Sequence, residues 1–289
     1  MTFFDPTKTN IPFIQYRKIL ISISVVLIAA SIALLATKGL NFGVDFTGVL
    51  QVEFEKPVDV GDVRAALAKI GHGSATIQAF DEKAILLRFQ AQDDEVRKAV
   101  LAVLTSDIGP YKVLRIDKIG PVVGGELRMQ AVWSLSLALA AILIYMAYRF
   151  RFGAVAVAAL MHDVIIMLGA YSLTGKEISV TFIAAILTIA GYSLNDSIVV
   201  LDRVRENWSD ARSLGIDKLV NRSINQTLSR TINTSLTTLL PIIAMYIWGG
   251  EVISNFAFAF LIGIVAGTYS SICIAGGLLV IWYLRSPKY

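Results

Sequence analysis

Long apolar segments separated by short charged stretches dominate the pattern of the chain. The six segments lie at residues 19–37, 129–148, 152–174, 178–201, 231–248 and 252–284. A helix needs about 20 apolar residues to cross the hydrocarbon core of a bilayer, so each segment is long enough to span it. The last is longer than one upright helix requires at about 1.5 Å per residue, so we expect residues 252–255 to lie at the interface. The pattern predicts a polytopic α-helical membrane protein with six transmembrane helices.

A hydrophilic insert, residues 38–128, separates the first two apolar segments. Alternating positions predict strands and helical spacing predicts helices, in the order 50–55 (strand), 58–70 (helix), 75–80 (strand), 83–89 (strand), 93–104 (helix) and 111–119 (strand). Gly71 is expected to end the first helix, and Asp81 with Glu82 to form a turn. This order is that of a ferredoxin-like α+β fold. The sequence therefore predicts such a domain between the first and second transmembrane helices.

Composition and charge distribution then predict the orientation. Only 17% of the 289 residues are charged and 55% are hydrophobic, against about 25% charged in soluble domains, and the mean hydropathy is +0.65. Basic residues gather at one end of the segments: Lys8, Arg17, Lys18, Arg149, Arg151, six residues between 203 and 230, Arg285 and Lys288. The short loops at the other end hold one lysine (175–177) and no basic residue (249–251). Since basic loops stay in the cytoplasm, we expect both termini there and the insert outside.

These expectations divide the chain into parts. They are a cytoplasmic N-terminal segment (1–18), the first transmembrane helix (19–37), the extracytoplasmic βαββαβ domain (38–128), a bundle of five transmembrane helices (129–284) and a cytoplasmic tail (285–289). The first segment is too long for a signal-peptide core and lacks a clear cleavage site, so we expect a retained anchor. The cytoplasmic loop 202–230 is amphipathic, which predicts helix lying on the membrane surface or against a partner. A solvated connector is the alternative.

Ionisable residues inside the apolar segments are candidates for function, because a charge near the bilayer centre costs from a few to more than about 10 kcal/mol. His162 and Asp163 lie near the middle of the third segment. Histidine titrates near physiological pH, so the two could pass a proton. Neighbouring helical residues point about 100° apart, which predicts that the two side chains serve different faces. Hydrogen bonding between helices is the alternative role for both.

A second candidate joins the fourth and fifth segments. Asp196 follows Asn195 and is expected to share a face with Thr188, Tyr192 and Ser193. Arg230 opens the fifth segment, and further polar residues follow at helical spacing: Thr234, Thr237, Thr238 and Pro241. Antiparallel segments would bring Asp196 and Arg230 to the same depth, where each charge offsets the desolvation of the other. An acid satisfied by nearby hydroxyls and an arginine reaching the interface are the alternatives.

Five blocks of sequence resemble a known family. They are GLNFGVDFTG (39–48), MHDV (161–164), TIAGYSLNDSIVVLDRVREN (188–207), LSRTINTSLTTLLP (228–241) and FLIGIVAGTYSSI (260–272). The chain resembles the SecF family, the smaller half of the bacterial SecD–SecF protein-export membrane complex, which has the fold of the RND (resistance-nodulation-division) superfamily. The resemblance covers nearly the whole chain and is most specific in the third and fourth blocks. It departs from the family at Val49, where a second glycine usually follows the motif.

The resemblance implies a subunit that uses the proton gradient to promote late-stage preprotein translocation through the SecYEG channel in the bacterial inner membrane. It places Asp196 and Arg230 in the proton pathway, to which we add Asp163 and His162. The supporting polar positions are Asn195, Tyr192, Thr188, Thr234, Thr237 and Thr238, and the motif leading into the outer domain holds Gly43, Asp45, Phe46 and Gly48. The implied partners are a separate SecD chain and SecYEG, with YajC as a further candidate, and SecA and preproteins indirectly. Nucleic acid, cofactors and metals are not predicted.

Two other classes remain as alternatives. A proton-coupled small-molecule exporter of the RND type would carry a much larger outer domain than the 91 residues of the insert 38–128. An intramembrane aspartyl protease would let Asp163 and Asp196 share a proton. That class resembles a Gly-x-Gly-Asp motif, whereas Asp163 follows Met-His and Asp196 follows Leu-Asn. We therefore expect a transport subunit without enzymatic activity.

Overall fold

The computed structural model describes residues 10–42, 49–54, 57–73, 75–79, 84–88, 94–117, 121–149 and 153–285. The chain divides into two compact units, a helical one of residues 1–41 and 135–289 and an α/β one of residues 42–134. The long helix α4 (Pro121–Arg149) contributes residues to both. The motif residues Gly43, Asp45, Phe46 and Gly48, and the predicted turn at Asp81 and Glu82, lie outside the described residues.

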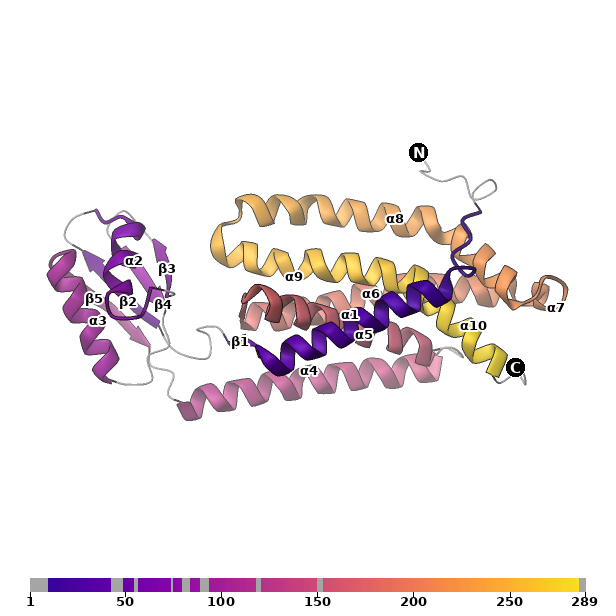
Figure 1. The fold of residues 1–289 in the computed structure, drawn as a ribbon, viewed down its shortest axis with the longest axis horizontal. Helices are drawn as coiled ribbons and strands as arrows, with labels where there is room; N and C mark the ends of the chain where they lie inside the picture. The colour runs from indigo at the N-terminus through magenta and orange to yellow at the C-terminus, as the bar shows by residue number, and fades with distance from the viewer. Residues whose placement is uncertain are drawn as a thin grey trace. The chain divides into compact units, whose positions relative to one another are not determined.

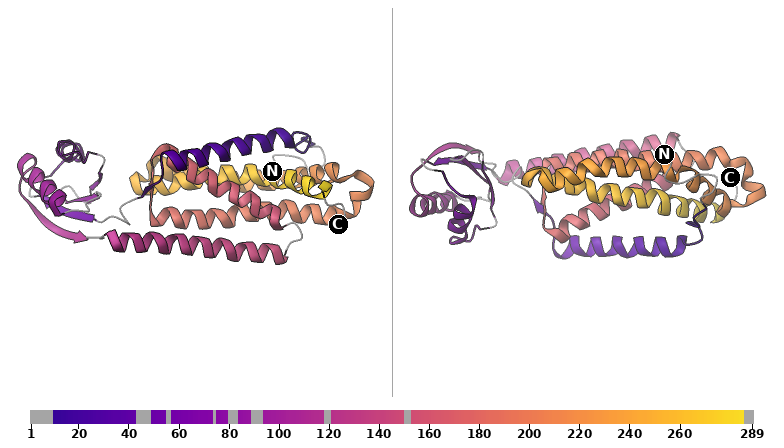
Figure 2. Two further views of the ribbon diagram at one scale, coloured as in Figure 1. Left: turned by 60° about the horizontal axis from the view of Figure 1, so that its bottom comes forward. Right: turned by 90° about the horizontal axis from the view of Figure 1, so that it is seen from above.

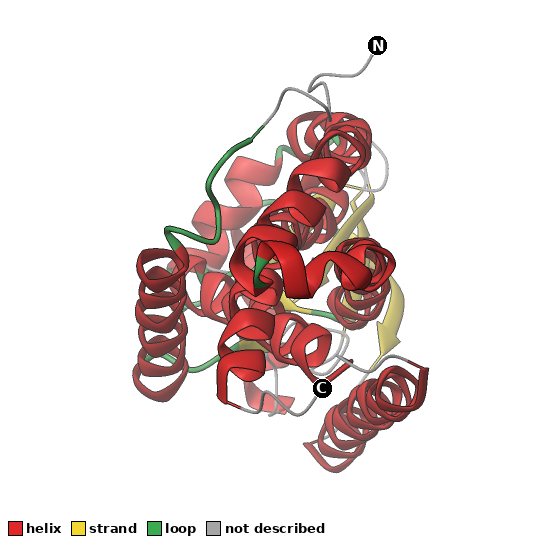
Figure 3. Cartoon of the chain, turned by 90° about the vertical axis from the view of Figure 1, so that its right-hand side faces the viewer, coloured by secondary structure: helices red, strands yellow, loops and turns green. Residues whose placement is uncertain are grey.

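The helical unit is a bundle of long apolar helices (Figures 1 and 3). In chain order its elements are α1 (Arg17–Thr37), β1 (Asn41–Phe42, whose second residue belongs to the other unit), α5 (Gly153–Thr174), β6 (Glu177–Ile178), α6 (Val180–Glu206), η2 (Asn207–Asp210), α7 (Ala211–Leu214), α8 (Ile216–Trp248), α9 (Gly250–Tyr269), η3 (Ser270–Ala275) and α10 (Gly276–Arg285). Among the described residues, five helical stretches are long and apolar enough to cross a membrane. In α4 the described apolar stretch is shorter, Met129–Ile142.

Small residues let the bundle helices approach closely. A methyl group on Gly169 of α5 would lie 2.2 Å from Ser31 Oγ of α1, and one on Gly263 of α9 would lie 2.6 Å from Ile189 of α6. Such contacts are typical of membrane helices, which gain more from close packing than from burial of apolar surface. The helix α9 packs against α5, α6 and α8, so it forms the centre of the bundle.

The helix α8 differs from the predicted fifth segment, because it begins at Ile216 rather than near residue 231. The predicted cytoplasmic loop 202–230 is therefore mostly regular helix that continues the neighbouring spans. Its apolar side chains Ile216, Leu219 and Val220 are buried. A methyl group on Gly276 of α10 would lie 3.3 Å from Val220. For these three residues other parts of the same chain, including α10, provide the cover, whereas Leu214 stays exposed.

The last apolar segment is also not one regular helix. It consists of α9, a six-residue π-helix η3 and α10, and residues 252–255 are helical within α9. The start of α1 and the end of α10 lie at the same end of the bundle, close to α7 (Figure 1).

The α/β unit contains β2 (Val49–Phe54), α2 (Val60–Ala68), β3 (Thr76–Ala79), β4 (Ala84–Arg88), α3 (Asp94–Asp107) and β5 (Tyr111–Asp117). Each predicted strand and helix of the insert is present, with ends within three residues of the predicted ones. The strands form an antiparallel sheet in the order β3-β4-β2-β5, with a register shift between Gln51 and Val52. Gly71 follows α2 with φ +81°, a backbone conformation that favours glycine.

Both helices of this unit cover the same face of the sheet (Figure 2). Alternate strand residues such as Val52, Phe54, Ile85 and Leu87 are buried there, together with helical side chains including Leu67 and Leu104. Side chains alternate between the faces of a strand, so this periodicity gives the sheet one apolar face. The side chain of Asp59 accepts a hydrogen bond from Gly61 N at 2.6 Å and caps the start of α2.

Candidate functional site

The carboxylate of Asp163 lies at the centre of a buried hydrogen-bond cluster that joins three elements. Helix α5 carries Asp163 near its middle, and the residue is completely buried. One oxygen, Oδ1, lies 2.9 Å from Nδ1 of His162. The other, Oδ2, accepts hydrogen bonds from Ser193 of α6 at 2.5 Å and from Ser270 of η3 at 2.8 Å. Two serine hydroxyls and the imidazole Nδ1 thus hold this carboxyl group in place through three side-chain hydrogen bonds.

The prediction that His162 and Asp163 serve different faces is wrong. Both residues are buried, and their side chains bond to each other. The angle of about 100° between neighbouring positions describes where side chains leave the helix. This angle does not fix the position of the Nδ1 atom, because rotation about the side-chain bonds of His162 can bring the ring toward Asp163. The other ring nitrogen, Nε2, is buried without a partner among the described residues, and the ring centre lies 6.0 Å from that of Tyr269.

The π-helix η3 supplies two consecutive serines to this part of the bundle. Ser270 reaches Asp163 of α5, whereas the hydroxyl of Ser271 lies 3.2 Å from that of Ser197 of α6. In a π-helix each turn is wider than in an α-helix, and such segments frequently lie at functional sites. We did not predict Ser270 or Ser271 as site residues, although two adjacent serines in an apolar span were a usable signal.

Asp196 has a different environment from Asp163. It is 3% exposed in α6, and its Oδ2 has no hydrogen-bond partner among the described residues. The buried hydroxyl of Tyr192, one turn earlier, also has none. Ser193, expected on the same face, instead bonds to Asp163. The alternative in which nearby hydroxyls satisfy this acid is therefore wrong.

The remaining polar positions of this stripe bond locally or face outward. Thr188 is exposed and donates to Ala184 O at 2.8 Å, and Asn195 is exposed. On α8 the threonine hydroxyls donate to backbone carbonyls of the preceding turn, Thr234 to Arg230 O, Thr237 to Asn233 O and Thr238 to Thr234 O. These threonines therefore leave Asp196 and Arg230 without a side-chain hydrogen bond from the predicted stripe.

Arg230 is the cation that faces Asp196. The two groups interact electrostatically, but they form no ion pair within 4.0 Å in the described part of the chain. Arg230 is exposed, and the hydroxyls of its neighbours Ser229 and Thr231 are buried without partners. The predicted ion pair is therefore not formed in this conformation. Asp196 is buried on α6, and the guanidinium of Arg230 on α8 has no ion pair among the described residues.

A polar network fixes α6 against α8 beyond this pair. Nε of Arg203 donates to Gln226 Oε1 at 2.7 Å. The side-chain amide of Asn207 donates to Gln226 and to Ser223, both at 2.9 Å. These bonds connect the end of α6 and the start of η2 to the first half of α8.

Two models of known protein families match this chain, over ranges that include the five blocks of sequence described above. The model of the protein-export membrane protein SecD/SecF C-terminal family matches residues 100–285, and that of the SecD/SecF GG motif matches residues 33–58. The chain belongs to the SecD/SecF family. A protein translocase subunit SecF from Desulfurispirillum indicum is 45% identical over 96% of this chain and 93% of its own length. That from Pseudomonas aeruginosa is 40% identical over 94% and 91%.

Solved structures of SecDF resemble the chain throughout. A crystal structure of SecDF, a translocon-associated membrane protein from Thermus thermophilus, is 42% identical over 96% of this chain, with a TM-score of 0.79. A SecDF structure in a super-membrane-facing form is also 42% identical, over 97% of this chain, with a TM-score of 0.80. The chain spans 39% and 40% of those longer chains. Together with its apolar helices, this family membership makes the protein a multi-pass membrane protein.

Proposed function

We propose that the chain is the SecF subunit of a protein-export complex that uses the proton gradient to promote late-stage preprotein translocation through SecYEG. Most of the length of its SecF relatives is present, but only 39% of the SecDF chain is. Its likeness to SecDF structures supports a SecD partner for this chain. The proposal places the protein in the bacterial inner membrane, with both termini in the cytoplasm and residues 38–128 outside it.

The proposed architecture has six transmembrane helices and a ferredoxin-like outer domain. The sheet order β3-β4-β2-β5 and the two helices on one face support the ferredoxin-like assignment. The helix α4 would provide the remaining span. Basic residues at the start of α1 and the end of α10, which lie at one end of the bundle, support a cytoplasmic location of that end.

The observation that carries the proton-coupling proposal is the unpartnered oxygen of Asp196. An ionised carboxylate without hydrogen bonds or a counter-charge is strongly destabilised in a buried site. Asp196 is 3% exposed, and Arg230 is the nearby cation. The acid can be stable in two arrangements, one with a bound proton and one paired with Arg230. Alternation between them would couple proton transfer to a relative movement of α6 and α8.

Asp163 and His162 have a different proposed role in the pathway. Three side-chain hydrogen bonds hold the carboxyl group of Asp163 in place, and one of their partners, Ser193, lies three residues before Asp196 on α6. The cluster would therefore fix α6 against α5 and η3 and would accept a proton only when these bonds open. His162, with an unpartnered Nε2, is the member of the cluster best placed to exchange that proton.

The two alternative classes receive less support from the geometry. Asp163 and Asp196 share no hydrogen bond among the described residues, whereas the carboxylates of an aspartyl protease share a proton. The outer unit has four described strands and two helices, which is small for a drug-exporter outer domain.

The experiment combines assembly with export. We expect Asp196→Asn and Arg230→Met to be expressed normally and to co-purify with a second six-span protein and the Sec channel. Both variants should fail to support export. The matched control is Asp202→Asn on the same helix, where the acid is about half exposed and pairs with Arg205 at 3.7 Å. Full export by Asp196→Asn, or recovery of the chain alone, would contradict the proposal.

A further inference from the structure

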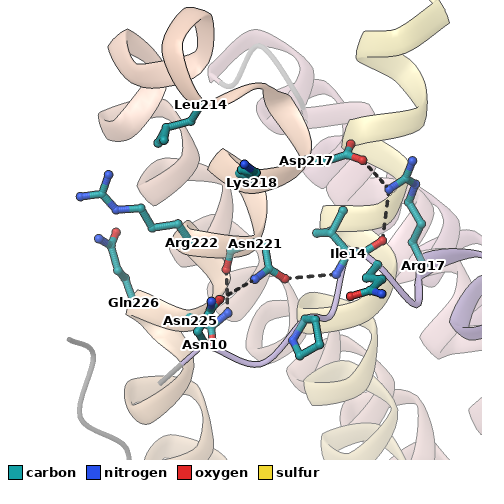
Figure 4. Close-up of a pocket in the computed structure, with 12 residues that line it drawn as sticks. Asn10, Ile14, Arg17, Leu214, Asp217, Lys218, Asn221, Arg222, Asn225 and Gln226 are labelled. Atoms are coloured by element: carbon teal, nitrogen blue, oxygen red, sulfur yellow. Dashed lines mark hydrogen bonds and ion pairs between the residues drawn. The ribbon is translucent and has the colours of Figure 1, made fainter. Parts of the chain in front are cut away.

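A polar cavity of about 930 Å³ lies between the N-terminal segment and the first half of α8 (Figure 4). Its walls come from residues 10–17 on one side and residues 214–226 on the other. It is separate from Asp163 and Asp196, neither of which lines it. Most of the lining side chains are charged or carry amides, so the cavity suits a polar ligand.

One wall of the cavity is held in place by side-chain bonds to the backbone. The amide of Asn225 donates to Ile11 O at 2.9 Å and accepts from Ile11 N at 2.8 Å. The amide oxygen of Asn221 accepts from Ile14 N at 3.2 Å. Asn225 and Ile14 are both nearly completely buried. The segment is therefore fastened to α8, and the cavity is a formed part of the fold.

The charge of the lining is positive. Arg17, Lys218 and Arg222 are its cations and Asp217 is its acid. Arg17 is neutralised by Asp217 at 2.9 Å. Lys218 and Arg222 lie one turn apart on α8 (Figure 4), which places them on one side of the helix. Within the described ranges Lys218 has no ion pair or hydrogen bond, and Arg222 uses only Nη1, in a solvent-exposed pair with Asp210 at 3.2 Å. The Lys218 ammonium and the remaining N–H donors of Arg222 are thus available to bind a phosphate.

The cavity lies where the chain enters the apolar part of the bundle. Arg17 is the first residue of α1, whose apolar run starts at Ile19. Beside α7, the rings of Trp208 and Tyr283 are in edge contact at 5.7 Å, and such aromatic residues are typical of the membrane–water interface. From Lys18 onward, one face of α1 is apolar and exposed, at Ile19, Ile23, Val26 and Leu27. Arg17 lines the basic cavity and the exposed apolar face of α1 starts at the following residues, an arrangement that fits a phospholipid better than a soluble anion.

We propose that this cavity binds the phosphate of an anionic phospholipid, with Lys218 and Arg222 contacting its oxygens and the acyl chains lying along α1. Basic pockets between membrane helices recognise such headgroups. Because the N-terminal segment forms one wall, the bound lipid would stabilise its attachment to α8. The inference is independent of the proposed role in export.

The test is native mass spectrometry of the full-length protein in detergent with added phosphatidylglycerol, phosphatidylethanolamine or inorganic phosphate. We expect the wild type to bind phosphatidylglycerol at least about tenfold more tightly than phosphatidylethanolamine. The double variant Lys218→Gln/Arg222→Gln should lose roughly 30-fold in affinity for phosphatidylglycerol, since each basic group near an anionic headgroup contributes a factor of about five. The matched control, Arg205→Gln/Arg212→Gln, removes two charges of the same region that do not line the cavity. It should change the affinity by less than about twofold.

Three results would overturn the proposal. They are equal losses in both double variants, equal binding of the two lipids by the wild type, and binding of inorganic phosphate without binding of phosphatidylglycerol. The single variant Lys218→Gln separates a loss of lipid binding from a loss of folding. Lys218 is exposed and without a described partner, so its replacement should not disturb the fold. It should lose roughly fivefold in affinity. No loss in this variant would also contradict the proposal.

Discussion

Removing the hydroxyl of Ser270 tests whether Asp163 is held as a charged acceptor. Ser270 donates to Asp163 Oδ2 at 2.8 Å, and the carboxylate is completely buried. Hydrogen bonds to charged groups contribute about 1.5–3 kcal/mol in soluble proteins. Those between membrane helices average about 0.6 and reach about 1.7 kcal/mol. We therefore expect Ser270→Ala to lower the free energy of unfolding by about 1–2 kcal/mol.

A matched control is available in Ser24, which is also buried. Its hydroxyl donates to the neutral phenol of Tyr269 at 3.2 Å, so Ser24→Ala should cost about 0.5 kcal/mol. The assay is reversible unfolding of the full-length protein in mild detergent by a chemical denaturant. Ser270→Ala should also cost little in an Asp163→Asn background, because the charged acceptor is already absent. Equal costs for the two serines, or additive costs of Ser270→Ala and Asp163→Asn, would refute the reasoning.

Three further predictions follow from particular contacts. Asp163→Asn should impair export more than His162→Asn, because the acid is bonded to three side chains, whereas the histidine is bonded to the acid alone among the described residues; equal, mild effects in an export assay would show that both only join helices. Gly169→Ala should destabilise the bundle, since the new methyl group would meet Ser31 of α1, whereas Gly191→Ala, inside α6, meets nothing within 4 Å and should not lower the thermal unfolding temperature. In the α/β unit, a hydrogen bond from Lys69, then one from Ser106, holds the pKa of Asp107 below its ordinary 3.8. The stability from this acid is fully present above that value and is lost as the pH falls through the lowered pKa, so Asp107→Asn should flatten the acid dependence of unfolding below about pH 4.

The α/β unit could be predicted element by element because its sequence signals are local. Alternation in β2 and β4 and helical spacing in α2 each require only a few neighbouring residues. The start of α8 was missed because the charged residues around Lys218 and Arg222 resemble a loop between spans. Their apolar neighbours Leu219 and Val220 are covered by other helices, which depends on tertiary packing.

The sequence predicted the two acids of the candidate site, but it did not predict the side chains that bond to them. Asp163 and Asp196 stood out because carboxylates are costly in apolar helices. The rotation of α6 against α5 and η3 decides which serine hydroxyls can donate a hydrogen bond to an acid. The spacing of residues on one helix does not show this rotation. Ser193 therefore bonds to Asp163, although it is only three residues from Asp196. The π-helix that brings Ser270 to Asp163 has no sequence signature comparable to that of a regular span.

Proton flux through the reconstituted complex tests the central claim most directly. The complex of this chain with its proposed SecD partner would be placed in liposomes with an imposed pH gradient and a pH-sensitive dye inside. The wild type and Asp202→Asn should conduct protons at similar rates, because Asp202 is half exposed and lies outside the candidate pathway. Asp196→Asn should reduce the flux to the level of empty liposomes, since the amide cannot exchange a proton. Undiminished proton flux in Asp196→Asn, in a complex shown to be assembled, would contradict the account.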